Sequence, residues 1–518
     1  MDPEIEQSTL RLRELKQKAL LGGGQEKLDA LRKKGKLSAR ERIALLTDPG
    51  SFTELHMLLG HATGNSGEGV VCGHATIGGR PVCLFSQDVS VRGGAAGREH
   101  HMKVNRVMDM ALDMGVPLIG LNDSPGARAY RLNEPMSSSP DKGSEATYMA
   151  LTQASGVVPQ ISAILGTCAG ATVYSAALTD FIFMVDGISQ MFITGPRVIK
   201  SVMSEDIGAE DLGGARVHAR VSGVCDFRLP DEQECMRTVR RLLTFLPSSC
   251  RESPPAVDTG DSPDRLDDEI ADLVPGDPRK SYDVRKVIAR LVDKGDFLEV
   301  KREFAPEMVV GFGRLEGRTV GIVANQPMAS AGALTCNGSR KQARFMRFCD
   351  CFNIPIIILV DNPGYAPGSS QEHAGMIHHG AKVLYALCEA TVPRIAVILR
   401  KMYGGGNLGM GVHPGLSTDF VFAWPIAQMG IMGAKETVEL FYSDEVKKAE
   451  NPEELKAKLV AGYKERYGSP FQSVSLGRFN IEDIIEPGET RVRLIRSLRL
   501  LRGKNVTRYP KRHGNMPL

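Results

Sequence analysis

Gln190-Met191-Phe192-Ile193-Thr194-Gly195 returns 238 positions later as Gln428-Met429-Gly430-Ile431-Met432-Gly433. Four further pairs of segments recur in the same order at nearly the same offset: VPLIGLND (116–123) with IPIIILVD (354–361), GGRPVCLF (78–85) with EGRTVGIV (316–323), LTDFIF (178–183) with STDFVF (417–422), and DPGSF (48–52) with DKGDF (293–297). This period is far longer than a solenoid repeat, so the chain is predicted to contain two duplicated domains.

A segment rich in Pro, Ser and Asp lies between the two halves, at residues 248–269. We interpret it as a linker, and we predict a first domain over residues 1–260 and a second over residues 275–518. Residues 1–36 are highly charged and carry spaced leucines, a pattern that is typical of an amphipathic helical arm and not of a signal peptide.

Each half predicts short apolar strands that end in glycine- or proline-rich turns and lead into helix-like segments. The clearest strands are expected at residues 116–120, 160–165, 354–360 and 394–399. Strands that alternate with helices predict an α/β fold with mostly parallel sheets, and ligands gather at the carboxyl ends of such strands. In this chain those ends carry NDSPGA, GTCAGA, VDNPGYAPG and RKMYGGG.

The composition of the 518 residues excludes several classes of protein. A net charge of +3 is too small to indicate a nucleic-acid partner, and no run approaches the ~20 apolar residues of a membrane span. The ten cysteines include no CxxC pair, so we expect reduced thiols in a cytoplasmic protein. His373, His378 and His379 do not share one helical face, so we interpret them as surface residues and expect no metal site.

Two glycine-rich turns have the composition of a backbone anion site. Gly170 and Ala171 open a small-residue helix after one strand, and Gly404, Gly405 and Gly406 stand in the equivalent place of the second half. Unpaired N–H groups at such a turn can hold an anion or an oxyanion that forms on a carbonyl, although close helix–strand packing is the alternative for either turn. Neither turn matches GxxxxGK[ST], and the chain has no GxSxG or HExxH motif.

Nearly the whole chain resembles the carboxyltransferase subunits of biotin-dependent enzymes: the propionyl-CoA carboxylases, the methylmalonyl-CoA decarboxylases and the methylmalonyl-CoA transcarboxylase. The resemblance rests on long stretches such as ALTDFIFMVDGISQMFITGPRVIKSV (177–202), EDLGGARVHARVSGV (210–224), HGAKVLYALCEATVPRIAVILRKMYGG (379–405) and FAWPIAQMGIMGAKETVEL (422–440). It implies an enzyme with two tandem crotonase-like domains, assembled as a homohexamer, in which the first domain of one subunit faces the second domain of another.

The resemblance also implies a division of labour between the two domains. The first would bind the acyl-CoA, such as propionyl-CoA or methylmalonyl-CoA, and hold its thioester oxyanion on the amides of Gly170 and Ala171. The second would bind biotin and hold its ureido oxygen on the amides of Gly405 and Gly406. The remaining implied site residues are Gly126, Ala127, Arg128, Leu408 and Tyr365 for the substrate, and Gly364 and Gly404 for biotin.

Several positions depart from the family's pattern around these sites. Pro125 replaces a glycine and removes a backbone donor, and Ala171 replaces a glycine but keeps its N–H. The loop at 129–147 is longer than usual. In the second half, the family's DVPGFLPG is replaced by DNPGYAPG (361–368), with Asn362 and Tyr365 among the changed positions. Leu408 matches the decarboxylases and the transcarboxylase, whereas many propionyl-CoA carboxylases have Asp there.

The implied reaction needs no side-chain base. Carboxybiotin releases CO2, the resulting anion takes the α-proton of the acyl-CoA, and the thioester enolate attacks the CO2. The chain has no Ala-Met-Lys-Met motif, so we expect biotin to arrive on a biotin carboxyl carrier protein or a biotin carboxylase subunit. Two alternatives remain: a crotonase-type CoA hydratase or thioesterase, and a non-catalytic scaffold subunit of a carboxylase complex.

Overall fold

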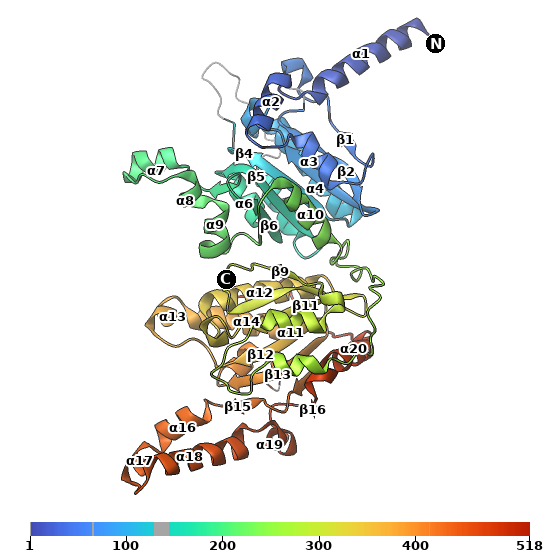
Figure 1. Cartoon of the computed structure of the whole chain (residues 1–518). Coiled ribbons are helices and arrows are strands. Elements are labelled where there is room, and N and C mark those ends of the chain that lie inside the picture. The colour runs from blue at the N-terminus through green and yellow to red at the C-terminus, as the bar shows by residue number, and fades with distance from the viewer. Residues whose placement is uncertain (1, 65–66, 129–143, 414, 518) are drawn as a thin grey trace. The chain divides into compact units, whose positions relative to one another are not determined.

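The computed structural model describes residues 2–64, 67–128, 144–413 and 415–517, and the chain divides into two compact units, Met1–Glu252 and Ser253–Leu518 (Figure 1). The division falls earlier than the predicted boundary near residue 260. Val257 N–H donates to the Gly317 carbonyl at 3.0 Å, and the Thr259 hydroxyl donates to Asp293 at 3.0 Å. Much of the proline-rich segment is therefore fixed to the second unit and is not a free linker.

Both units contain an eight-stranded mixed sheet, and the two sheets share one topology. The first consists of β1 (Thr53–Leu55), β2 (Val70–Ile77), β3 (Arg80–Gln87), β4 (Leu118–Ser124), β5 (Gln160–Ala169), β6 (Phe181–Val185), β7 (Gln190–Phe192) and β8 (Phe227–Leu229). The second consists of β9 (Leu298–Val300), β10 (Met308–Leu315), β11 (Arg318–Asn325), β12 (Ile356–Asn362), β13 (Arg394–Tyr403), β14 (Phe420–Ala423), β15 (Gln428–Gly430) and β16 (Asp483–Ile484).

The strand order confirms the internal duplication. It is β1-β2-β3-β4-β5-β6-β8 in the first unit and β9-β10-β11-β12-β13-β14-β16 in the second, with β7 paired to β5 and β15 paired to β13. The first two pairings of each sheet are antiparallel and the others are parallel. Each unit is therefore α/β, as predicted.

Helices connect the parallel strands and cover the sheets. The first unit has α1 (Pro3–Leu20), α2 (Gln25–Lys33), α3 (Ala39–Leu46), α4 (Arg98–Met114), α5 (Ser144–Ala154), α6 (Thr172–Ala177), α7 (Pro196–Met203), α8 (Ala209–Gly213), α9 (Ala215–Val217) and α10 (Glu232–Leu243). The second has α11 (Val284–Leu291), α12 (Cys336–Cys351), α13 (Ser369–His373), α14 (Met376–Glu389), α15 (Gly406–Gly409), α16 (Ala434–Phe441), α17 (Ser443–Lys448), α18 (Pro452–Tyr463), α19 (Pro470–Ser475) and α20 (Thr490–Leu501).

The predicted strands are present, but they run further at their carboxyl ends. β5 continues to Ala169 and β13 to Tyr403, which brings the strand to the glycine-rich turn itself. The pairing of β4 with β5 shifts register between Asn122 and Ser124, and that of β12 with β13 shifts between Val360 and Asn362. Such irregularities bend a strand and re-aim its side chains, so both units carry the same bend next to the same turn.

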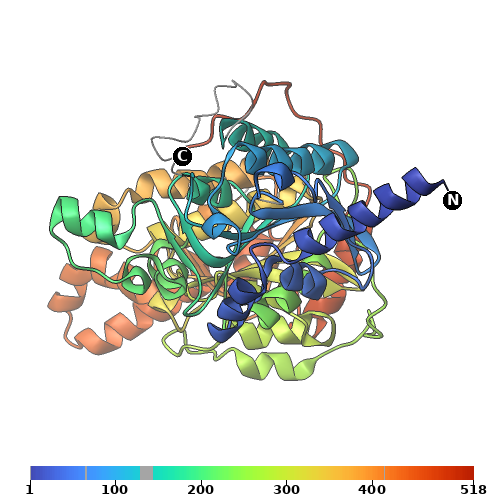
Figure 2. The same cartoon turned by 90° about the horizontal axis from the view of Figure 1, so that it is seen from above.

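The N-terminal arm is helical, as predicted, and α1 extends away from the rest of the first unit (Figure 2). It ends before Gly22, Gly23 and Gly24, and α2 follows them. Ser38 then caps α3 through a reciprocal pair of hydrogen bonds with Glu41, which fixes where the globular part of the unit begins. Among the described residues, no helix is long and apolar enough to cross a membrane.

Candidate active site

The glycine-rich turn of the first unit joins β5 to α6. Gly170 has a φ of +63°, a left-handed conformation that glycine adopts without strain. Its N–H donates to the carbonyls of Phe192 and Ile193 at 3.3 and 3.2 Å, so the turn is tied to the end of β7. Ala171 then caps the helix and Thr172 opens it. The first amides of a helix have no partner inside it, which leaves Ala171 and Thr172 as the available donors.

The second unit repeats this turn between β13 and α15. Gly404 has a φ of +50°, and its N–H donates to the carbonyl of Gly430 at 2.8 Å, at the end of β15. Gly405 caps the helix and Gly406 opens it. Among the described residues, neither the amide of Gly405 nor that of Gly406 donates to a backbone carbonyl.

The two turns are therefore equivalent with Gly170 in the place of Gly404, a different alignment from the one that the sequence predicted. The prediction paired the amides of Gly170 and Ala171 with those of Gly405 and Gly406. The structure commits the Gly170 amide to the sheet, as it does the Gly404 amide, so the free pairs are Ala171–Thr172 and Gly405–Gly406. This correction could not come from the sequence, because it depends on the pairing of β7 with β5.

A second predicted glycine lies beside each turn, after the neighbouring strand. Gly126 has a φ of +107° and Gly364 a φ of +126°. A Cβ at Gly126 would lie 2.8 Å from the carbonyl oxygen of Ala169, so only glycine allows this loop to approach the first turn. The amide of Gly126 is held by the Ser124 hydroxyl at 3.2 Å, and that of Gly364 by the Asn362 side-chain oxygen at 2.7 Å.

Pro125 is less of a departure than its sequence context suggests. It precedes Gly126 in the first unit just as Pro363 precedes Gly364 in the second. The loops that follow form matching parallel bridges, Ala96 with Ala127 and Leu334 with Tyr365. Both units therefore have the same Pro-Gly turn, and the same type of bridge follows it.

Tyr365 and Leu408 lie at the second turn. A Cβ at Gly405 would be 3.2 Å from Tyr365 Cδ2, so the tyrosine ring lies close to Gly405. Burial raises the pKa of Tyr365 to about 12, which keeps its hydroxyl protonated. Leu408 is half-buried in α15, one turn of chain beyond Gly405.

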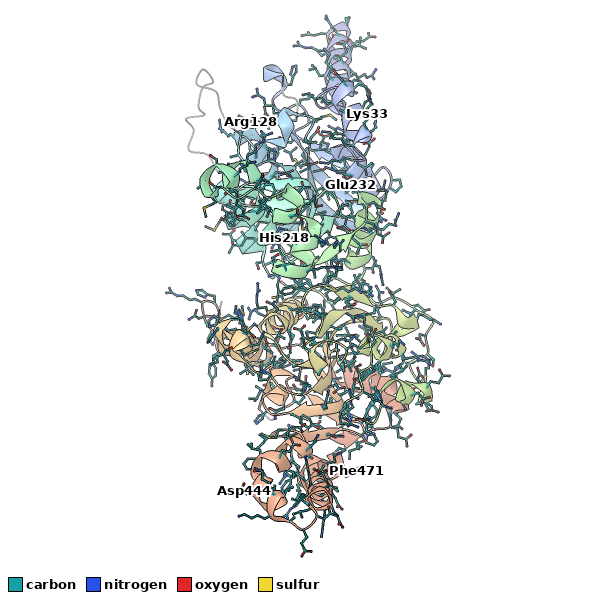
Figure 3. All side chains as sticks on the ribbon, turned by 60° about the vertical axis from the view of Figure 1, so that its left-hand side comes forward. Lys33, Arg128, His218, Glu232, Asp444 and Phe471 are labelled. Carbon is teal, nitrogen blue, oxygen red and sulfur yellow. The ribbon has the colours of Figure 1, made fainter. Side chains whose placement is uncertain are left out.

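Arg128 lies beside the first turn, and Figure 3 shows its place in the first unit. Its guanidinium donates to Glu68 at 2.8 Å, and both side chains are largely buried. The bond from the Arg128 backbone N–H to the carbonyl of Ala96, at 2.9 Å, ties this loop to the segment at Ala96. Arg128 is thus paired with Glu68 in the structure, and its predicted contact with the substrate stays a prediction. Residues 129–143 of the predicted long loop lie outside the described residues.

The strand ends also carry two buried carboxylates, but both are paired. Asp123 accepts from Lys36 at 2.7 Å and Arg42 at 3.0 Å, whereas Asp361 accepts from Arg400 at 3.0 Å. Within the described residues, no group of three or more His, Cys, Asp or Glu side chains is arranged to hold a metal ion. Each unit also offers free backbone donors, which can stabilise an oxyanion.

Sequence reasoning missed Ser124, Thr172 and Asn362. The signal for the first and third was their place two residues before a glycine, where a short polar side chain accepts from the backbone. Thr172 was missed because the free amides begin one residue later than predicted.

Residues 30–516 match the model of the carboxyl transferase domain family. The chain belongs to this family. A carboxyltransferase subunit of propionyl-CoA carboxylase from Haloferax mediterranei is 46% identical over 98% of both chains. The alpha subunit of methylmalonyl-CoA decarboxylase from Veillonella parvula is 45% identical over 97% of both. The transcarboxylase 12S structure, a hexamer solved with methylmalonyl-coenzyme A and methylmalonic acid bound, matches with a TM-score of 0.93 at 42% identity, over 100% of this chain and 98% of that one.

This carboxyl transferase is therefore an enzyme of the predicted biotin-dependent type, with the fold class that the sequence indicated. Neither a CoA hydratase nor a thioesterase accounts for a match over the full length of both units. The duplicated turns described above are the candidate active-site features of this carboxyl transferase.

Proposed function

We propose that this carboxyltransferase moves a carboxyl group between biotin, carried by a partner protein, and the α carbon of propionyl-CoA or methylmalonyl-CoA. The observation that carries the proposal is the pair of equivalent turns, each offering two free amides at the carboxyl ends of parallel strands. Two ligands must each hold a developing negative charge on oxygen in such a transfer, and two matching donor sites meet that requirement.

The first unit would bind the acyl-CoA. Its thioester oxygen would accept from the amides of Ala171 and Thr172, with Gly170 shaping the turn and Gly126 and Ala127 lining the approach. The Tyr148 hydroxyl donates to the Ala171 carbonyl at 2.9 Å, which steadies the peptide that follows it. Hydrogen bonds fixed in advance at the place where charge develops lower the barrier without reorganisation.

The second unit has residues that fit biotin. The amides of Gly405 and Gly406 are free, and the lack of a side chain at Gly405 leaves room beside the Tyr365 ring for a flat ureido group. Gly404 and Gly364 shape the turn and the neighbouring loop. When bound, biotin would supply the carboxyl group from its ureido nitrogen, and that nitrogen would take up the α-proton once the carboxyl group has left, while the ureido oxygen accepts from the Gly405 and Gly406 amides.

No protein side chain is needed as the base, and the local groups agree with this. Tyr365 keeps its proton because burial raises its pKa to about 12, and burial raises the pKa of Tyr403 to about 12 as well. Asp361 is buried and paired with Arg400, so it is held as a structural anchor below the turn.

The choice of acyl group is proposed to depend on Leu408. It lies on α15 beside the free amides and offers a branched apolar surface. Such a wall suits the methyl group of a propionyl or methylmalonyl chain better than it suits a longer chain. The alpha subunit of the Veillonella decarboxylase and the transcarboxylase 12S protein act on or bind methylmalonyl-CoA by their names, which supports this choice.

We also propose the finer features of assembly, partner and location. The partner is a biotin carboxyl carrier protein or a biotin carboxylase subunit, and the two units are crotonase-like. A homohexamer is supported by the hexamer of the transcarboxylase 12S structure. The ten cysteines are free thiols, which supports a reducing cytoplasmic location. Co-purification with the carrier tests the proposed partner, and cell fractionation tests the proposed location.

The reaction is tested with the purified chain, methylmalonyl-CoA and free biotin or a biotinylated carrier domain. We expect propionyl-CoA to form with the carboxyl label appearing on biotin, and no reaction without biotin. Release of free CoA without biotin would indicate a thioesterase, and no turnover with either biotin source would indicate a scaffold.

A further inference from the structure

Two buried carboxamides contact the short helix that begins at Gly406. Asn362 is the last residue of β12, and Gln342 lies on α12. Both side chains are 0% exposed to solvent. They approach α15 from two different elements, so the helix is held from both sides of the turn.

Asn362 contacts both the loop at Gly364 and the first residue of α15. Its Oδ1 accepts from the Gly364 N–H at 2.7 Å, which fixes its orientation because the reversed amide would bring two donors together. The plane of the carboxamide packs on Gly406: a Cβ there would lie 2.9 Å from both Cγ and Nδ2 of Asn362. A bulkier side chain at position 362 would therefore press on the residue that supplies the second free amide.

Gln342 holds the other end of α15. Its Nε2 donates to the carbonyl of Gly409 at 2.7 Å, the last residue of the helix. A helix of four residues has little intrinsic stability, so its direction depends on such tertiary contacts. With Asn362 at Gly406 and Gln342 at Gly409, both ends are fixed.

Each carboxamide leaves one polar atom without a partner. Among the described residues, neither Asn362 Nδ2 nor Gln342 Oε1 makes a hydrogen bond. Burying an unpaired polar atom opposes folding, and an apolar residue of the same size would remove that cost. The free energy of folding therefore does not explain why these two buried side chains are polar.

The first unit shows that the fold itself does not require this arrangement. Ser124 there holds Gly126, in the role that Asn362 has at Gly364. The buried lysines Lys103 and Lys341 are 238 positions apart, which places Val104 opposite Gln342. One unit builds the same topology with a hydroxyl and a valine, so the two carboxamides are specific to the second turn.

We propose that Asn362 and Gln342 are positioning residues that set the direction of the Gly405 and Gly406 amides toward the ureido oxygen of biotin. The proposal rests on the proposed function, because it takes biotin as the ligand of the second unit. It adds that the donor pair is aimed by buried side chains that never touch the ligand.

The test compares Asn362→Leu, Asn362→Ser and Gln342→Met with the wild-type assembled enzyme. Leucine keeps the branching of asparagine at Cγ but cannot accept from Gly364, whereas serine restores an acceptor of the kind found at Ser124. Affinity for free biotin and for a CoA ester is measured by calorimetry, beside the transfer rate and the melting temperature. We expect Asn362→Leu and Gln342→Met each to weaken biotin binding about tenfold with CoA-ester affinity unchanged, and Asn362→Ser to recover most of the loss.

Unchanged biotin affinity and transfer rate in Asn362→Leu and Gln342→Met would overturn the proposal. A joint fall in both affinities together with a lower melting temperature would also overturn it, because the side chains would then be structural. A fall in CoA-ester affinity with biotin binding intact gives a different result: the positioning role stands, but the assignment of biotin to the second unit fails.

Discussion

At Gly405, the absence of a side chain leaves space beside the two free amides of the second turn. Its φ of −62° is open to any residue, so the backbone conformation does not require glycine here. It does favour glycine at Gly404, whose φ is +50°. Gly405 matters because a Cβ there would already lie 3.2 Å from the Tyr365 ring, so a branched side chain would crowd the turn far more than alanine would.

We predict that Gly405→Val lowers carboxyl transfer at least ~100-fold, the order of a lost oxyanion donor. Acyl-CoA affinity should stay near wild type, because that ligand is assigned to the other unit. Gly405→Ala is the matched control, since Ala171 occupies the equivalent position in the first unit, and it should lose much less. Rates and CoA-ester affinity on correctly assembled protein check the prediction, and near-normal turnover of the valine variant contradicts it.

Leu408 is the second position where one side chain should decide a property. We predict that Leu408→Asp changes the ranking of acyl-CoA substrates about tenfold or more, because a charge in an apolar wall must be solvated or paired. Leu408→Met keeps an apolar surface of similar volume and should leave the ranking unchanged. Relative kcat/KM values for acetyl-, propionyl- and butyryl-CoA give the answer. An unchanged ranking in the Asp variant would mean that Leu408 does not line the acyl site.

At the scale of helices and strands, the sequence predicted which segments form the site but not which of their atoms are free. The strands before Gly170 and Gly404 are apolar and β-branched, and the turns that follow are glycine-rich, so both elements were predictable. The hydrogen bonds of the Gly170 amide to the end of β7 were not predictable, because they depend on where this short strand pairs with β5. Such long-range pairing leaves no local signal in the sequence.

Each unit has a buried lysine that donates to backbone carbonyls, Lys103 in the first and Lys341 in the second. Lys341 should make the free energy of unfolding depend on pH. Lys341 on α12 donates to the carbonyls of Lys301 and Phe304, both at 2.8 Å. Burial lowers its pKa from 10.5 to about 7, although the carboxylates of Glu299 and Glu307 favour the charged form. The positive charges of Arg285 and Lys301 act in the same direction as burial.

Between pH 7 and 10.5 the unfolded chain binds a proton at this lysine that the folded chain does not. Stability contributed by this group therefore rises with pH in that window, by about 1.4 kcal/mol per pH unit at most. We predict that Lys341→Met removes this rise, whereas Lys286→Met, at an exposed position on α11, keeps it. Chemical denaturation at pH 7, 8 and 9 provides the measurement. Parallel curves for wild type and Lys341→Met would contradict the prediction.

At the scale of the whole molecule, each unit leaves an apolar helix exposed. α7 and α16 follow the equivalent strands β7 and β15 and extend from their own units (Figure 1). Val202 on α7 is 72% exposed and Phe441 on α16 is 71% exposed, which is unusual for such side chains unless another surface covers them. The sequence indicated assembly only through the family resemblance, because exposure cannot be known before the fold is.

We therefore predict that the wild-type chain forms a homohexamer, and that Val202→Asp or Phe441→Asp yields smaller species. An aspartate at either position would place a charge in an interface that is apolar in this proposal. Light scattering coupled to gel filtration measures the mass, and circular dichroism confirms that the variants remain folded. An active monomer of the wild-type protein would refute the prediction.

The assembly also decides where an active site is completed, and mixed oligomers can show it. Ala171→Leu should block the donor pair of the first unit, and Gly405→Val that of the second, so each variant alone should be inactive. If the first unit of one subunit works with the second unit of another, co-refolding equal amounts of both variants restores about a quarter of the wild-type sites, since each half is intact in half of the subunits. If both turns of one chain form a single site, every site in the mixture keeps one blocked turn and no activity returns. The transfer rate of the mixture therefore distinguishes active sites formed by two subunits from active sites formed within one chain.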